Sequence, residues 1–289
     1  MKLPITQSPQ LVKQTEIALA YAIFQRERHG KRLEQVVLAP ENKRGYLGVS
    51  SIATPPCVLY YSLTNEPKEE TDLPSRFGFD TGHILEGYVL DLLQAEERQG
   101  ELSWPYLLAP GGVIKGHFDG RTKNLIQEGA CIIEVKATGG YSFNKKIEEG
   151  ADNGHIEQAF VYAVGSSSPY FVIIYCNREA KKSTPFYAVF GFYIPDMVAA
   201  KKAVLDLFAE RFDPVLLSLH HELRPDQPEK PRWEFGPRGW RCRPDSSYFT
   251  KGGKENFTVG YCSYRGTCPE GLAYREIEEE RKVEKAAAA

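Results

Sequence analysis

Hydrophobic positions recur along the chain with two different spacings, which predict helices and strands. Helical spacing predicts helices over residues 11–28, 77–99, 153–165 and 196–223. Short apolar runs typical of strands occur at residues 113–118, 130–137, 170–176 and 186–194. The polar stretch 139–154 is predicted to be a loop. Helices and strands in this order predict an α/β protein with helices on both faces of a mixed central sheet.

Two carboxylates and a lysine stand out at the ends of the first two predicted strands. Asp119 ends the apolar run 113–118, and Glu134 and Lys136 are two positions apart in the second strand. Alternation along a strand therefore directs Glu134 and Lys136 to one face, with Val135 on the other. Carboxylate oxygens favour Mg²⁺ or Mn²⁺, and a nearby ammonium can position and activate a metal-bound water. This chemistry suits phosphodiester hydrolysis. The short pattern alone also fits a surface aspartate beside a solvated Glu–Lys pair.

Two of the predicted helices carry further candidates. His83 and Glu86 lie one turn apart on the helix 77–99, which precedes the strands and can aim an imidazole at the same metal. Gln158 and Tyr162 are four apart on the later helix and share a face, with His155 one turn earlier. The alternatives are an exposed or structural histidine, a solvated glutamine and a core tyrosine.

Composition limits the function classes without selecting one. The 289 residues contain 36 basic and 38 acidic side chains, a net charge of −2, so any DNA contact must come from a local patch. No apolar run approaches the roughly 20 residues that cross a bilayer, and no signal-peptide core is visible at the N-terminus. We therefore expect a cytoplasmic protein with no membrane partner, whose cysteines are thiols or metal ligands.

Cysteines cluster in the C-terminal part of the chain. Residues 225–254 contain five Pro, four Gly and seven Lys or Arg, a composition typical of a basic, aromatic arm outside the core. Cys242, Cys262 and Cys268 in and after this arm suggest a zinc or iron–sulfur site. Three ligands leave one vacancy, for which Cys57 is the candidate. Cys131 and Cys176 fall inside strand runs, where inert core thiols are expected. The predicted division is an N-terminal helical segment (1–45), a core (46–224) and the arm with a charged tail (225–289).

Taken together, these motifs resemble the RecB-type branch of the PD-(D/E)XK nuclease superfamily, over roughly residues 46–270. More narrowly, they are similar to its iron–sulfur members, which include CRISPR-associated RecB-like exonucleases and AddB-type nuclease domains. The matching motifs are Gly82-His83, the G-x-x-D of Gly116 to Asp119, the E-x-K of Glu134 to Lys136, the Q-x-x-x-Y of Gln158 to Tyr162, and the cysteines 57, 242, 262 and 268. In one departure, nineteen residues separate Cys242 from Cys262 where the family has C-x-x-C.

The resemblance implies a restriction-endonuclease-like core and a metal-dependent DNA exonuclease that acts on DNA ends in recombination, repair or phage DNA metabolism. His83, Asp119, Glu134 and the Val135 carbonyl would ligate Mg²⁺ or Mn²⁺. Lys136 would orient the attacking water, and Gln158 and Tyr162 would position Lys136 or the DNA backbone. The four cysteines would hold a [4Fe–4S] cluster, with Zn²⁺ as the alternative. DNA would be the substrate, and a helicase, recombinase or integrase the protein partner.

Two other functions fit the same motifs. One is a CRISPR adaptation nuclease that trims pre-spacer DNA with an integrase partner. The other is a non-catalytic DNA-end-binding or structural protein that retains the nuclease fold. The presence of His83, Asp119, Glu134 and Lys136 argues against a protein without turnover, because a site that performs no chemistry has no physical need for them.

Overall fold

The structure is a computed structural model, which describes residues 2–29, 46–54, 56–67, 73–126, 128–181 and 184–220, with three isolated positions near the C-terminus. The described residues form two compact units. The sheet unit comprises those within 1–53 and 72–208, and the second unit those within 54–71 and 209–289. All predicted site residues of the carboxylate and lysine motifs lie in the sheet unit.

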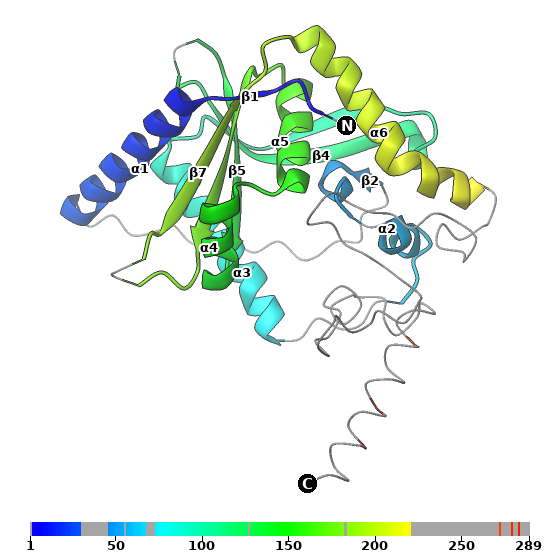
Figure 1. Cartoon of the computed structure of the whole chain (residues 1–289), viewed down its shortest axis with the longest axis horizontal. Coiled ribbons are helices and arrows are strands. Elements are labelled where there is room, and N and C mark those ends of the chain that lie inside the picture. Colours follow the sequence, from blue (N-terminus) through cyan, green and yellow to red (C-terminus); the bar gives the residue numbers. More distant parts are fainter. Residues whose placement is uncertain are drawn as a thin grey trace. The chain divides into compact units, whose positions relative to one another are not determined.

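The sheet unit is built on a seven-stranded mixed sheet (Figure 1). Its strands are β1 (Thr6–Gln7), β2 (Leu47–Gly48), β3 (Glu97–Pro105), β4 (Val113–Thr122), β5 (Cys131–Thr138), β6 (Tyr170–Asn177) and β7 (Tyr187–Tyr193). The order is β1-β7-β6-β5-β4-β2, and β3 pairs with β4. The β5–β6 and β2–β4 pairs are parallel, and the other pairs are antiparallel. The predicted α/β architecture with a mixed central sheet is therefore confirmed.

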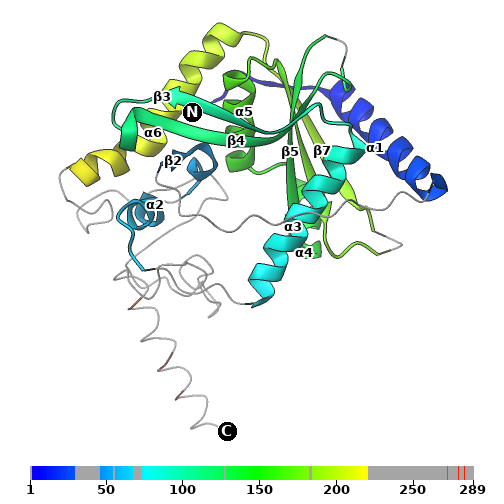
Figure 2. The same cartoon turned by 180° about the vertical axis from the view of Figure 1, so that it is seen from behind.

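Helices cover both faces of this sheet. The helices of the sheet unit are α1 (Pro9–His29), α3 (Leu73–Leu92), α4 (Gly140–Glu149), α5 (Asn153–Gly165) and the part of α6 (Met197–His220) up to Phe208. Helices α1 and α3 lie on one face (Figure 2), and α5 lies on the other (Figure 1). Short 3₁₀ turns occur at Val49–Ser51 and Pro110–Gly112. The second unit contains α2 (Pro56–Leu63), in which Tyr61 is buried.

Side-chain alternation along β5 decides which residues reach the site. Cys131, Ile133 and Val135 pack into the hydrophobic core shared with α1 and α3. The alternate residues Glu134 and Lys136 therefore project from the opposite face, which α5 covers. Strand β6 is buried at every position, as expected for a central strand with helices on both faces.

One predicted helix end and one predicted loop were wrong. The helix predicted to reach residue 99 ends at Leu92, because Gln94 adopts a positive φ of 50° and Glu97 begins β3. The stretch predicted as a loop contains α4, whose Phe143 is fully buried. The glycines at 139 and 140, of which the second begins α4, and the many polar side chains of the helix make its composition resemble that of a loop.

The remaining predictions concern membrane spans, the C-terminal arm and the domain boundaries. No helix among the described residues is long and apolar enough to cross a membrane. The arm predicted at 225–289 lies outside the described residues apart from the three isolated positions. The domain boundaries at 45 and 224 therefore stay predictions.

Candidate active site where two strands separate

The two predicted carboxylates lie where strands β4 and β5 stop pairing. The ladder between these strands consists of Thr122 with Cys131, Arg121 with Ile132, and Gly120 with Ile133. Asp119 and Glu134 are the next residue on each strand. Backbone groups that would otherwise bond across the ladder are therefore available to side chains at this point.

The pairing of β3 with β4 is also interrupted at Asp119, although the register is the same on both sides of the interruption. The pairing passes from Arg98 with Gly120 to Gly100 with Phe118 and omits Gln99 and Asp119. Gln99 has a positive φ of 50°, a left-handed conformation that favours glycine. Asp119 therefore lies at a break in both of its ladders.

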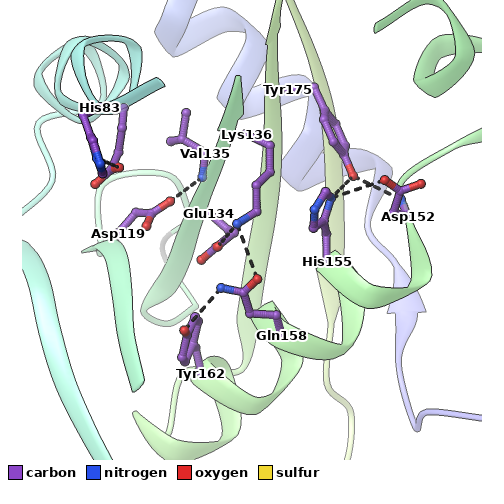
Figure 3. A network of polar contacts seen from close by, with 11 residues as sticks. His83, Asp119, Glu134, Val135, Lys136, Asp152, His155, Gln158, Tyr162 and Tyr175 are labelled. Atoms are coloured by element: carbon purple, nitrogen blue, oxygen red, sulfur yellow. Dashed lines mark hydrogen bonds and ion pairs between the residues drawn. The ribbon is translucent and has the colours of Figure 1, made fainter. Parts of the chain in front are cut away.

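Each carboxylate has a specific partner in this opening (Figure 3). Asp119 Oδ2 accepts the Val135 amide N–H at 2.7 Å and so replaces the missing backbone partner. Glu134 is 1% exposed, and its Oε1 accepts a hydrogen bond from Lys136 Nζ at 2.6 Å. The other oxygen, Glu134 Oε2, is buried with no hydrogen-bond partner among the described residues. A buried carboxylate oxygen without a partner is costly, which suggests a ligand for it.

Lys136 is held from its other side by helix α5. Gln158 Oε1 lies 3.4 Å from Lys136 Nζ, and Gln158 Nε2 donates to the Tyr162 hydroxyl at 3.2 Å (Figure 3). Tyr162 is 1% exposed, and its ring lies edge-on to Phe118 at 6.5 Å between centroids. Gly116 admits this ring, because a Cβ at position 116 would lie 2.6 Å from Tyr162 Cε1. The predicted Q-x-x-x-Y pair is thus a buried support for the lysine.

A third carboxylate, Glu86 of α3, adds to the negative charge of the site. Burial and the charge of Glu86 raise the pKa of Asp119 to about 7, against Lys136 and the Val135 amide, which lower it. Burial and Asp119 raise the pKa of Glu134 to about 8, although Lys136 opposes this. Burial and Glu134 likewise raise the pKa of Glu86. The three carboxyl groups therefore oppose one another's ionisation.

The lysine is the positive partner of this cluster. Burial alone would lower the pKa of Lys136, but the charges of Glu134, Asp119 and Glu86 and the hydrogen bond to Glu134 raise it above its ordinary value. Lys136 therefore stays protonated at neutral pH. Its ammonium supplies the positive charge that the carboxylates need.

His83 occupies a more peripheral position than predicted. Its side chain is 61% exposed, and its Nδ1 lies 3.6 Å from Glu86 Oε2. Its neighbour Glu86 is electrostatically linked to the site, since the charge of Glu86 raises the pKa of Asp119 and the charge of Glu134 raises the pKa of Glu86. Sequence reasoning did not select Glu86 as a site residue, although its place one turn after His83 was a usable signal. Within the described residues, no three His, Cys, Asp or Glu side chains are gathered closely enough to hold a metal ion as they stand.

The chemistry of the donors nevertheless fits a hard divalent cation. The set consists of carboxylate oxygens, which Mg²⁺ and Mn²⁺ prefer. One oxygen of Glu134 is buried without a partner, and a cation would relieve the repulsion that raises the carboxyl pKa values. Side chains would have to rearrange to bring three ligands together.

The predicted cysteine cluster is largely outside the described part of the chain. This holds for Cys242, Cys262 and Cys268 and for the side chain of Cys57, whose backbone belongs to α2. Cys131 and Cys176 are free and buried in the core of the sheet unit, as predicted. Burial raises the pKa of both thiols, which makes them unreactive.

Comparisons with known proteins give low similarity throughout. No family model and no curated protein matches the chain. The crystal structure of SSO0001 aligns at 16% identity and a TM-score of 0.43, over 88% of this chain and 95% of that one. An alkaline exonuclease, LHK-Exo from Laribacter hongkongensis, aligns at 12% identity and a TM-score of 0.42, over 62% and 93%. LHK-Exo in complex with dAMP aligns at 13% and 0.43, over 62% and 94%.

Proposed function

We propose that this protein is a divalent-metal-dependent nuclease that hydrolyses phosphodiester bonds of DNA. The observation that supports it most is the convergence of Asp119, Glu134 and Lys136 where β4 and β5 separate. A buried carboxylate oxygen without a partner, next to a second carboxylate and a protonated lysine, combines cation binding with stabilisation of a developing negative charge.

In this proposal Asp119 and Glu134 hold Mg²⁺ or Mn²⁺ together with the Val135 carbonyl. The N–H and C=O of one strand residue point to the same side, so the Val135 carbonyl is directed toward β4 with the amide that binds Asp119. On α3, Glu86 and His83 are additional candidate ligands. The bound metal would lower the pKa of water and offset charge on the phosphate.

Lys136 has a separate role in the proposed reaction. Its protonated amine donates hydrogen bonds to a phosphate oxygen or to the attacking water, and it offsets charge that develops on the phosphate. Gln158 orients this amine, and the buried Tyr162 hydroxyl holds the Gln158 amide in place. The chain of contacts thus limits the motion of Lys136 without removing its charge.

Exonuclease action on DNA ends is the finer part of the proposal, and it derives from the family resemblance. The same resemblance supports a [4Fe–4S] or zinc site at Cys57, Cys242, Cys262 and Cys268. A helicase, recombinase or integrase remains the proposed class of protein partner. Hydrolysis from ends requires a free terminus, which makes linear and closed circular DNA distinguishable substrates.

The decisive experiment measures cleavage of end-labelled linear DNA and covalently closed circular DNA with Mg²⁺, Mn²⁺ or EDTA. We expect mononucleotides or short products from linear DNA with either metal, and no cleavage in EDTA. The Glu134→Gln variant serves as the catalytically impaired control. Wild-type activity that persists in EDTA, or an absence of cleavage in every condition, would contradict the proposal. Equal cleavage of circles would retain the nuclease and reject the exonuclease.

A further inference from the structure

A second polar cluster lies one strand away from the candidate active site on the same face of the sheet. Tyr175 of β6 is the register partner of Lys136 and is fully buried. Its hydroxyl accepts the Asp152 amide N–H at 3.0 Å and lies 2.8 Å from His155 Nδ1 (Figure 3). The imidazole of His155 is therefore anchored by a side chain that cannot move without disturbing the core.

The hydrogen-bond pattern assigns a tautomer to His155. The Tyr175 oxygen already accepts an amide hydrogen, so its own O–H requires an acceptor in this buried setting. His155 Nδ1 is the acceptor within reach. The remaining ring hydrogen of a neutral imidazole is then carried by Nε2.

The surroundings of His155 keep its ring neutral. Burial and the charge of Lys136 lower the pKa of His155 to about 4. Asp152, whose Oδ2 lies 3.6 Å from Nδ1, opposes this, and Lys146 adds to it. Lys146 Nζ lies 2.5 Å from Asp152 Oδ1, so the negative charge of Asp152 is already offset by this lysine.

His155 is the accessible member of a stripe that faces the site. His155, Gln158 and Tyr162 follow one another at helical spacing along α5. Their exposure falls from 31% for the His155 side chain to 8% for Gln158 and 1% for Tyr162. Gln158 and Tyr162 support Lys136 from inside, whereas the described residues give His155 a hydrogen-bond contact at Nδ1 alone. The Nε2–H donor remains for a group from outside the protein.

We propose that His155 is a further substrate-binding residue, whose Nε2–H donates to a non-bridging phosphate oxygen of the nucleic-acid strand beside Lys136. This inference rests on the proposed nuclease function and extends it by one subsite. A phosphodiester oxygen is an anionic acceptor with no hydrogen to donate, so it matches a ring fixed as a donor. Because the donor is neutral, it would add affinity without adding an ionic contact.

The test compares three substitutions that separate the two ring nitrogens. Glutamine places an amide nitrogen near the position of Nε2, and asparagine places one near Nδ1. The affinity for a fluorescein-labelled single-stranded oligonucleotide is measured by fluorescence anisotropy in EDTA, with the melting temperature of each free protein. We expect His155→Ala and His155→Asn to weaken binding about tenfold, as loss of one hydrogen bond to a charged group does, and His155→Gln to bind nearly as wild type.

The salt dependence of binding and the Tyr175→Phe variant test the His155 contact in two further ways. Loss of a neutral donor should leave the slope of log affinity against log salt unchanged, whereas Lys136→Ala should reduce it by about one. Tyr175→Phe, which keeps the ring but removes the hydroxyl, should weaken binding in the same direction as His155→Ala.

The possible results distinguish a failure of the His155 subsite from a failure of the proposed nuclease function. A purely structural role would lower the melting temperature of the alanine, asparagine and glutamine variants alike and leave affinity equal among them. Unchanged affinity of His155→Ala in a wild-type protein that cleaves DNA would overturn the subsite and leave the nuclease intact. A wild-type protein that neither binds nor cleaves DNA would overturn the proposed function first.

Discussion

The carboxylate of Asp119 accepts the amide hydrogen of Val135 at 2.7 Å, across the point where their two strands stop pairing. Asp119 Oδ2 thus accepts a backbone N–H of β5 that has no partner in the strand ladder with β4. Asp119 therefore has two roles, to accept the Val135 amide and, in the proposed function, to bind the metal. A substitution by asparagine distinguishes the two. Asparagine keeps an oxygen acceptor for Val135 but carries no charge.

Asp119→Asn should fold and lose metal binding. We expect the metal-free variant to melt at or above the wild-type temperature at alkaline pH, because one of three mutually repelling carboxylates is gone. Mn²⁺ should raise the melting temperature of wild type and leave that of Asp119→Asn unchanged, which differential scanning calorimetry can measure. Equal stabilisation of both proteins by Mn²⁺ would remove Asp119 from the ligand set.

Lys136→Met should abolish cleavage and preserve the fold. The methionine keeps the aliphatic stem, and Glu134 and Asp119 can remain protonated when the ammonium is absent. Removing an oriented charge from a reaction of this type costs a few kcal/mol, or roughly 10²-fold or more in turnover. The exposed Lys201 of α6 is a matched control, and Lys201→Met should cleave at the wild-type rate. A Lys136→Met protein with wild-type turnover would contradict the assigned role.

Local sequence pattern accounts for much of the fold and for part of the site. Alternation along one strand places Glu134 and Lys136 on a common face, and helical spacing joins Gln158 to Tyr162, because these relationships depend on neighbours in the chain. The approach of Asp119 to Val135 depends on the register of two strands. The contribution of Glu86 depends on how α3 packs against the sheet, and the contact of Tyr175 with His155 joins β6 to α5. Such relationships arise from tertiary packing and have no local signature.

Two glycines, Gly116 of β4 and Gly82 of α3, should respond to alanine in opposite directions. A Cβ at Gly116 would lie 2.6 Å from the Tyr162 ring and 3.0 Å from Val49. Gly116→Ala should therefore destabilise the protein by about 1–3 kcal/mol and lower turnover by displacing the support of Lys136. At Gly82 on α3 the nearest atom to an added Cβ is the Ala137 Cβ at 3.8 Å, an ordinary contact. Gly82→Ala should stabilise the protein by about 0.5–1 kcal/mol.

Urea denaturation and steady-state cleavage measure the two effects in parallel. The free energies of unfolding of Gly116→Ala and Gly82→Ala are compared with that of wild type under one set of conditions. A Gly116→Ala protein of wild-type stability and turnover would show that the Tyr162 ring can move freely, contrary to its burial.

The cysteine site has its own prediction, which derives from the family resemblance. Protein purified without oxygen should be brown if Cys57, Cys242, Cys262 and Cys268 hold a [4Fe–4S] cluster, and colourless with bound zinc in the alternative. Cys268→Ser should lose metal and melt at a lower temperature, because binding free energy at a structural site is folding free energy. The buried core thiol Cys176 supplies the control, and Cys176→Ala should keep its metal. A Cys57→Ala protein with unchanged metal content would exclude Cys57 as a ligand.

The carboxyl pKa values predict how stability and metal affinity change with pH. In the folded metal-free protein the pKa is about 7 for Asp119 and about 8 for Glu134. In the unfolded chain such groups have pKa values of about 4. The folded state therefore binds more protons than the unfolded state between about pH 4 and pH 8, so this contribution to the free energy of unfolding falls as pH rises.

The melting temperature of metal-free wild type should therefore decrease from about pH 5 to about pH 9 relative to a variant with both Asp119→Asn and Glu134→Gln, which lacks the two titrating groups. Mn²⁺ affinity should change in the opposite direction, by up to about tenfold per pH unit for each proton released, because the ligands must lose protons to bind. Calorimetric titration in two buffers of different ionisation enthalpy counts those protons directly. Binding without proton release near neutral pH would show that the metal is held by groups other than this carboxylate pair.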